Sequence, residues 1–380
     1  MTGRERLTTT FRGQKADRIP VSPFIWFNNV FEMFGYTPHI DDNFSPRDFD
    51  VVSKWVEYCD TFGFDVLFAG GFLWDRFIPD TSENWEVDIE RAGDRDSEKR
   101  TTVVRTPEGE LTQVMNFRRI SPHLIVAATE KYVIEEKRDF ELVQKYAPPA
   151  NYADLEMISR AREIIGDKGL VNLATFGTFN TLNMFRKLDT MMMDPFIDEG
   201  FYRAMMDFFA DWDAELNRRV VAAGADSLEL GGNLATSGSG PDFFQSFVAE
   251  YENRLARGIH KAGGFVVYHN CGDAQKIMHL YNDLEIDVWG YITGPPFGDV
   301  VLEDALRIMR PDMALRGNID QVEFIPKATP REISDRVRQL FDKVRGRGNW
   351  ILSTSDFFSD GTSYDNIHAF ADAGLEYGRY

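Results

Sequence analysis

Short runs of apolar residues recur along the chain, and longer segments with helical spacing separate them. Eight of these runs have the length and the branched or aromatic side chains that are typical of buried strands. They cover residues 19–24, 65–70, 170–177, 226–232, 265–271, 287–292, 313–319 and 350–356. Eight buried strands that alternate with helices favour an α/β fold of the (β/α)8 barrel type over a doubly wound sheet.

The segment between residues 240 and 263 shows the helical spacing most clearly. Its large apolar side chains recur at steps of three and four residues, as on one face of a helix. Pro241 suits the first turn of that helix, and Gly263 suits its end. We therefore predict a helix over this segment.

One part of the chain, about residues 80–140, breaks the alternation of strands and helices. The stretch "TTVVRTPEGELTQVMNF" (101–117) predicts two strands joined by a Pro-Glu-Gly turn, which is a β-hairpin. The charged stretch "DIERAGDRDSEKR" (88–100) before it predicts a solvated loop. We predict a single barrel domain over residues 1–380 that carries an N-terminal extension and this insertion.

Composition narrows the class of protein. Hydrophobic residues make up 43% of the chain and include 31 Phe, enough for a large core. A net charge of -19 argues against nucleic acid or an anionic membrane as partner. Two cysteines cannot form a disulfide framework, and neither a signal peptide nor a long apolar run is present, so we expect a soluble cytoplasmic protein. The oligomeric state stays open.

The stretch "YHNCGD" places His269 and Cys271 at the end of a predicted strand. Residues two apart in a strand point to the same side, here toward the barrel mouth, where ligands bind. An imidazole and a thiolate are preferred ligands of zinc. Asp356, which ends the last strand, and Glu229, in the strand before that of His269, are the carboxylates that could complete the site. The same pair could also be a hydrogen-bonded core pair without metal.

Five stretches, spread in order along the chain, resemble the uroporphyrinogen decarboxylase superfamily. They are "RERLTTTFRGQKADRIPVSPF", "RTPEGEL", "YHNCGD", "GNID" and "ILSTSD". The resemblance implies a (β/α)8 barrel. The stretch "FIWFNNVFEMFG" (24–35) lacks the arginines of the decarboxylase's first substrate loop, so a tetrapyrrole with many carboxylates finds no obvious cationic cradle there.

The chain looks closer to the zinc-dependent corrinoid methyltransferases of that superfamily, which carry His-x-Cys on one strand and a further Cys after the last. This resemblance implies that His269 and Cys271 bind Zn²⁺ and that Asp356 replaces the second Cys. A carboxylate in place of a thiolate leaves a harder metal, which suits an ether oxygen. Members that resemble O-demethylases pass the methyl group of a methoxylated aromatic to the Co(I) of a corrinoid carried by a partner protein.

We therefore predict a zinc-dependent O-demethylating methyltransferase in which Asp356 and Glu229 act at the metal, Glu229 as a fourth or displaceable ligand. An aromatic ether needs an apolar slot with a few polar groups. Aromatic residues near predicted strand ends supply the slot: Trp26, Phe27, Phe72, Trp74, Phe176 and Phe179. Asn180 and Asn233 are predicted to meet oxygen substituents on the ring.

Two alternatives remain. One keeps the fold and the zinc but transfers a methyl group from a methyl-corrinoid to a thiol, or takes it from an amine or methanol. The other is a metal-free decarboxylase-like or ligand-binding barrel in which His269 and Cys271 are structural. The Asp at position 356, where the family has Cys, keeps this second alternative open.

Overall fold

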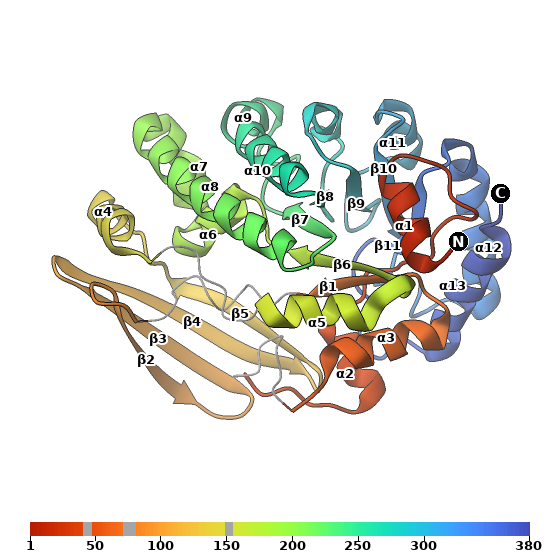
Figure 1. Ribbon diagram of the computed structural model, residues 1–380, viewed down its shortest axis with the longest axis horizontal. Helices are drawn as coiled ribbons and strands as arrows, with labels where there is room; N and C mark the ends of the chain where they lie inside the picture. The colour runs from red at the N-terminus through yellow and green to blue at the C-terminus, as the bar shows by residue number, and fades with distance from the viewer. Residues whose placement is uncertain (41–47, 71–80, 149–154) are drawn as a thin grey trace.

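The computed structural model describes residues 1–40, 48–70, 81–148 and 155–380. Its main sheet has seven parallel strands in the order β1-β6-β7-β8-β9-β10-β11 (Figure 1). These strands are β1 (Val66–Gly70), β6 (Gly169–Ala174), β7 (Ser227–Gly231), β8 (Phe265–His269), β9 (Val288–Ile292), β10 (Ala314–Ile319) and β11 (Trp350–Thr354). All residues of β1, β6, β7, β9 and β11 are buried, which explains their continuous apolar runs.

The eighth predicted strand, residues 19–24, forms only a single parallel bridge, between Val21 and Leu352 of β11. On one side the Leu352 N–H donates to the Pro20 carbonyl at 2.9 Å, and on the other the Asp65 N–H donates to the Val21 carbonyl at 2.8 Å. The segment thus joins the two edges of the curled sheet. Pro20 and Pro23 lack an N–H, so a longer ladder cannot form here. The predicted (β/α)8 architecture is confirmed, with an irregular eighth segment.

A buried carboxylate, Asp65, holds this closing segment. It accepts hydrogen bonds from Arg6 Nη1 at 2.5 Å, Arg18 Nη1 at 2.9 Å and the Val21 N–H at 3.0 Å. Its side chain is 3% exposed. The N-terminal extension is therefore part of the barrel closure.

The Asp65→Asn variant is expected to lower the free energy of unfolding by about 3 kcal/mol, because it removes the charge of a buried carboxylate that pairs with both Arg6 and Arg18 and leaves Arg6 with Asp17 alone. Chemical denaturation measures this change. Asp60→Asn is the matched control, since Asp60 pairs with Lys168 at the surface, and it should cost no more than about 1 kcal/mol. Equal losses in the two variants would contradict the role given to Asp65.

Helices cover the outside of the sheet (Figure 1). They are α1 (Gly3–Phe11), α2 (Phe27–Phe34), α3 (Val51–Phe62), α4 (Lys137–Tyr146), α5 (Leu155–Ile165), α6 (Thr178–Phe185), α7 (Leu188–Ile197), α8 (Glu199–Ala222), α9 (Pro241–Phe247), α10 (Ala249–Ala262), α11 (Leu302–Ile308), α12 (Pro330–Val344) and α13 (Tyr364–Tyr377). The predicted helix between residues 240 and 263 is divided into α9 and α10 at Val248, whose φ is -123°. Within the described ranges, no helix is both long and apolar enough to cross a membrane.

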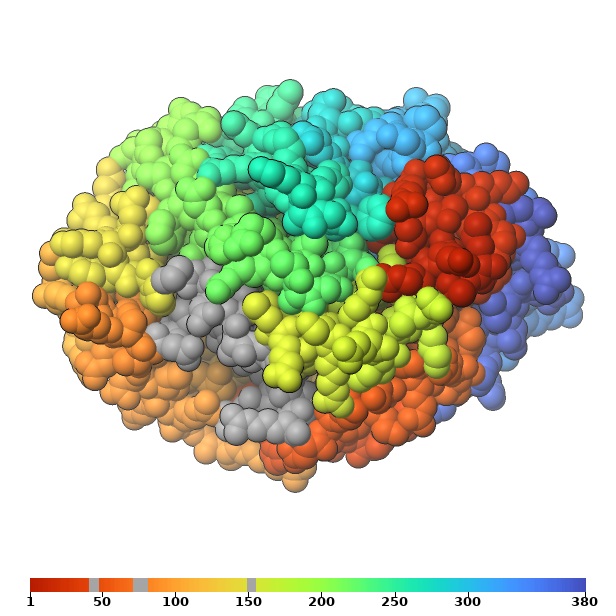
Figure 2. Space-filling model, viewed as in Figure 1, coloured from red at the N-terminus to blue at the C-terminus, as the bar shows by residue number. Residues whose placement is uncertain are grey.

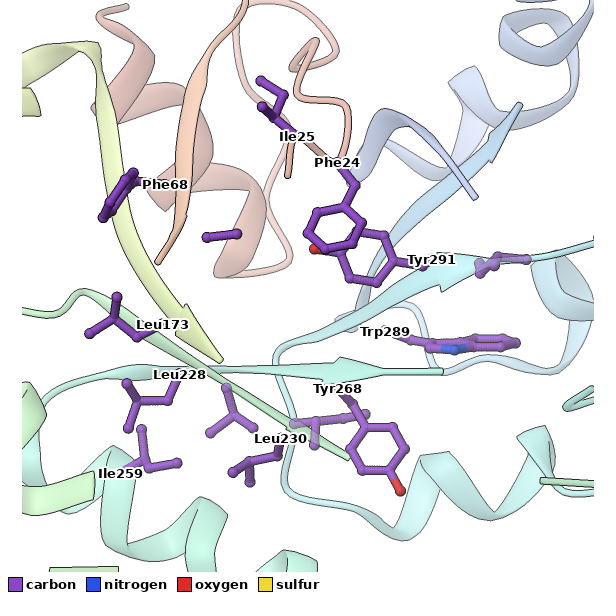
Figure 3. Packing of buried hydrophobic residues seen from close by; sticks show 14 of the residues in the cluster. Phe24, Ile25, Phe68, Leu173, Leu228, Leu230, Ile259, Tyr268, Trp289 and Tyr291 are labelled. Atoms are coloured by element: carbon purple, nitrogen blue, oxygen red, sulfur yellow. The ribbon is translucent and has the colours of Figure 1, made fainter. Parts of the chain in front are cut away.

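The main core lies between the helices and the sheet. Figure 3 shows Leu228 and Leu230 of β7 pointing toward Ile259 of α10, while Tyr268 of β8 lies beside them. All four side chains are 0 or 1% exposed. This packing fixes the strand ends that carry the polar residues described below.

Residues 86–131, inside the predicted insertion, form a second, antiparallel sheet in the order β2-β3-β4-β5. Its strands are β2 (Glu86–Gly93), β3 (Ser97–Thr106), β4 (Gly109–Ser121) and β5 (Leu124–Lys131). The predicted hairpin is confirmed within β3 and β4. The loop predicted at 88–100 is wrong, because an edge strand such as β2 is held by backbone hydrogen bonds while nearly all its side chains stay exposed. In Figure 2 this sheet lies at the end of the molecule opposite the C-terminal helices.

Candidate active site

A cavity of about 700 Å³ lies between the mouth of the barrel and the inserted sheet. Strand ends of the barrel line one side, with Glu229, His269 and Asp356 among them. The other side includes Arg100 and Thr102 of β3 and Gln113 and Met115 of β4. These four residues were not predicted as part of the site. The two-residue spacing within each pair was the available signal, since such residues share one face of a strand.

The predicted polar residues come together at the barrel side of this cavity. His269 Nδ1 lies 2.6 Å from Glu229 Oε1, and Cys271 Sγ donates to Asp356 Oδ2 at 3.2 Å. The Cys271 N–H also donates to Asn233 Oδ1 at 3.1 Å. Strands β7, β8 and β11 thus deliver one imidazole, one thiol and two carboxyl groups to the same place.

Burial and mutual contacts shift the pKa values of these groups. Burial raises the pKa of Cys271 and of Asp356. Burial alone would lower the pKa of His269, but Cys271 and Glu229 raise it well above its ordinary value. Burial alone would raise the pKa of Glu229, but the hydrogen bond with His269 lowers that pKa overall. A metal ion bound by the thiol and the imidazole would therefore displace protons.

The donor set, an imidazole, a thiol and a carboxyl group, fits zinc in chemical type. Because Glu229 occupies Nδ1 of His269, the Nε2 atom remains for a metal, and a carboxylate on the far nitrogen is the usual partner of a metal-binding imidazole. His269, Cys271 and Asp356 would hold the ion. In the described parts of the chain no three His, Cys, Asp or Glu side chains already have metal-binding spacing, so these three side chains, which now hydrogen-bond to protein groups, would have to rearrange around the ion. Both oxygens of Glu229 are engaged by protein groups, so Glu229 would have to give up a hydrogen bond to serve as the predicted fourth or displaceable ligand.

The predicted substrate residues divide into two groups. Trp26, Phe176, Asn180 and Asn233 line the cavity. Phe24 and Phe357 line it as well, although neither was predicted from the sequence. Phe357 directly follows Asp356, and its ring lies 6.4 Å from that of Trp26 with the planes at 25°. The cavity therefore has an aromatic wall beside the candidate metal ligands.

Phe27 and Phe179 do not belong to the described lining. Each is 1% exposed. Phe27 packs edge-on against Trp55 at 5.7 Å, and Phe179 packs against Phe243 at 5.8 Å. Both lie in the first turn of a helix, where the chain has turned away from the strand end. Phe72 and Trp74 lie outside the described residues.

A buried carboxyl group supports the turns behind this wall. Glu252 of α10 is 2% exposed and accepts a hydrogen bond from the Gly231 N–H. Its Oε1 lies so close to Gly177 that a Cβ there would come within 1.9 Å. Gly177 follows Phe176, whose φ is 60°, so Glu252 fixes the turn that presents Phe176 to the cavity.

Burial raises the pKa of Glu252 to about 8, from 4.5. Its protonated form is favoured in the folded protein, so its stabilising effect is complete below about pH 4.5 and is lost as the pH rises through about 8. Glu252→Gln stays neutral and should gain stability over the wild type by up to about 4 kcal/mol between about pH 5 and pH 9. Denaturation at both pH values measures the gain. The exposed Glu250→Gln control should show none, and a pH-independent difference for Glu252→Gln would contradict the assignment.

The model of the uroporphyrinogen decarboxylase (URO-D) family matches residues 122–377, more than half of the chain. The chain belongs to this family. The predicted superfamily is thereby confirmed. The matched segment includes the strand ends that carry Glu229, His269, Cys271 and Asp356.

Three curated relatives align with part of the chain. The methylated-thiol–coenzyme M methyltransferase of Methanosarcina mazei is 25% identical over 174 residues, 46% of this chain and 44% of that protein. The uroporphyrinogen decarboxylase of Citrifermentans bemidjiense is 26% identical over 174 residues, 44% of this chain and 46% of that protein. Methylcobamide:CoM methyltransferase MtbA of Methanosarcina acetivorans is 20% identical over 221 residues, which are 56% of this chain and 61% of that protein. The chain spans about half the length of the curated relatives it matches.

Two solved structures have the same fold as this chain. A methyltransferase from Methanosarcina mazei superposes with a TM-score of 0.71 at 14% identity and covers 99% of both chains. A B12-independent methionine synthase from Shewanella sp. W3-18-1 superposes with a TM-score of 0.52 at 14% identity over 86% of both chains. Likeness at this identity extends to the architecture alone.

Proposed function

We propose that this member of the URO-D family is a zinc-dependent, corrinoid-linked methyltransferase. The observation that carries the proposal is the meeting of His269, Cys271 and Asp356 at one side of a cavity of about 700 Å³. Two of the three curated relatives are named as methyltransferases, one of them for methylcobamide. The Co(I) corrinoid would arrive on a partner protein and take the methyl group at the cavity.

We further propose that the methyl donor is a methoxylated aromatic. Zinc, when bound, supplies a Lewis acid that stabilises negative charge on an ether oxygen. The ring of the donor would lie against Phe24, Trp26 and Phe357, which line the cavity, and Asn180 would meet an oxygen substituent. These apolar walls exclude water from the leaving oxygen, which strengthens its electrostatic interactions.

Transfer from a methyl-corrinoid to a thiol is the second candidate, because one relative is named for methylated thiols. Asp356, where the resemblance to the corrinoid methyltransferases implies Cys, favours the ether, since an oxygen ligand leaves the metal harder and less suited to binding a thiolate.

Decarboxylation of a multiply charged tetrapyrrole has less support. Among the described residues that line the cavity, Arg100 is the only Lys or Arg, and its guanidinium is paired with Glu98 at 2.9 Å. A substrate with many carboxylates needs more cationic groups than this.

Optical spectroscopy of cobalamin tests the proposed function. Zinc-loaded protein, free cob(I)alamin and guaiacol should convert the Co(I) spectrum to that of methylcobalamin. Methylcobalamin with a small thiol, in the absence of the ether, is the competing arm. Turnover in the thiol arm alone would reject the ether as donor, and no turnover in either arm together with binding of a uroporphyrinogen would reject the methyltransferase.

A further inference from the structure

A row of buried polar groups continues from His269 into the interior of the barrel. Glu229, whose Oε1 contacts His269 Nδ1, accepts two further hydrogen bonds at Oε2. They come from the hydroxyl of Tyr291 on β9 at 3.0 Å and from Asn172 Nδ2 on β6 at 2.9 Å. The carboxylate is therefore held from three sides.

The next group in the row is a guanidinium. Arg316 of β10 is 1% exposed, and its Nη1 donates to the Tyr291 hydroxyl. Its Nη2 donates to the carbonyls of Ser22 at 3.2 Å and Pro23 at 3.1 Å, in the closing segment of the barrel. The guanidinium also lies over the Tyr291 ring, 4.4 Å from its centroid. A buried positive charge with this many partners is fixed in position.

Tyr291 itself is placed by an unusual backbone conformation. Its φ is 68°, in the left-handed region that residues other than glycine rarely adopt. Its ring lies 4.5 Å from the ring of His269 and 4.6 Å from that of Phe24. Figure 3 shows the Phe24 and Tyr291 rings side by side. The strained residue thus contacts both the candidate metal ligand and the aromatic wall.

We propose that Arg316 and Tyr291 are positioning residues that set the orientation of His269. They hold the Glu229 carboxylate as the acceptor of the Nδ1–H proton, so that Nε2 faces the metal. Arg316 also donates to the carbonyls of Ser22 and Pro23, which precede Phe24. The same guanidinium therefore helps to position both His269 and the aromatic wall. This inference rests on the proposed metal site.

Tyr291→Phe tests the inference, because it removes one hydroxyl and keeps the ring. The zinc affinity, measured by competition with a chelator, is expected to fall by about 10- to 100-fold. The absorption spectrum of the cobalt(II)-substituted protein should also change, since the imidazole is no longer held in one orientation. Arg316→Lys, which retains the charge but not the fork of donors, should change the spectrum in the same direction.

Tyr202→Phe is the matched control. Tyr202 is 0% exposed on α8 and donates to the Phe247 carbonyl at 3.0 Å, outside the site. Its loss should leave the zinc affinity unchanged. If Tyr291→Phe binds zinc as tightly as Tyr202→Phe and gives the wild-type cobalt spectrum, the positioning role is overturned while the metal site stands. Absence of zinc binding by the wild type would overturn the proposed function and this inference together.

Discussion

Replacing His269 with alanine is expected to remove the bound metal and to lower methyl transfer by at least about 100-fold, because changes to the partners of a metal ligand already cost about 10- to 100-fold. The remaining thiol and carboxylate do not make a set of three protein ligands, which a catalytic zinc needs. Metal content of the purified protein and the rate of Co(I) methylation measure the two effects.

His279→Ala is the control for this variant, since His279 is exposed and lies outside the cavity lining. It should retain both metal and activity. A His269→Ala protein with full zinc content would show that the imidazole does not bind the metal, and a wild-type protein without zinc would favour the metal-free alternative.

Exchanging Asp356 for cysteine is expected to keep the zinc and to change the reaction. The thiolate would restore the second Cys that the resemblance to the corrinoid methyltransferases implies at this position, and it would leave the metal less acidic. We expect ether demethylation to fall by about 10- to 1000-fold, the range of a lost electrostatic contribution, while transfer to a thiol rises or becomes measurable. Rates with guaiacol and with a thiol, at equal zinc content, give the comparison.

Asp356→Ala completes the Asp356 series. It should lose zinc as well as both activities, because the carboxylate beside Cys271 would no longer be there to bind the metal. Unchanged demethylation by the Asp356→Cys variant would mean that the carboxylate does not set the choice of donor.

The barrel could be predicted because buried parallel strands leave continuous apolar runs, as in 226–232 and 287–292. Residues 19–24 have the same apolar character, but their prolines cannot donate to a ladder, so the segment closes the sheet through a few backbone hydrogen bonds around Val21. Strand β2 could not be predicted, because an edge strand with exposed side chains has no alternation to detect.

The meeting of Glu229, His269, Cys271 and Asp356 was predictable from their positions at strand ends, which converge in a parallel barrel. The roles of Tyr291 and Arg316 were not. Each lies in an apolar strand, and no local pattern indicates that their long side chains reach across the interior to Glu229. Phe27 and Phe179 were placed in the cavity from proximity in sequence, but the helical turn directs both into the core.

X-ray absorption at the zinc edge tests the metal site most directly. The wild-type protein should contain about one zinc per chain, with one sulfur at about 2.3 Å and nitrogen or oxygen neighbours at about 2.0–2.2 Å. Cys271→Ser should remove the sulfur signal. A zinc environment without sulfur, or a protein that takes up no zinc at all, would contradict ligation by His269, Cys271 and Asp356.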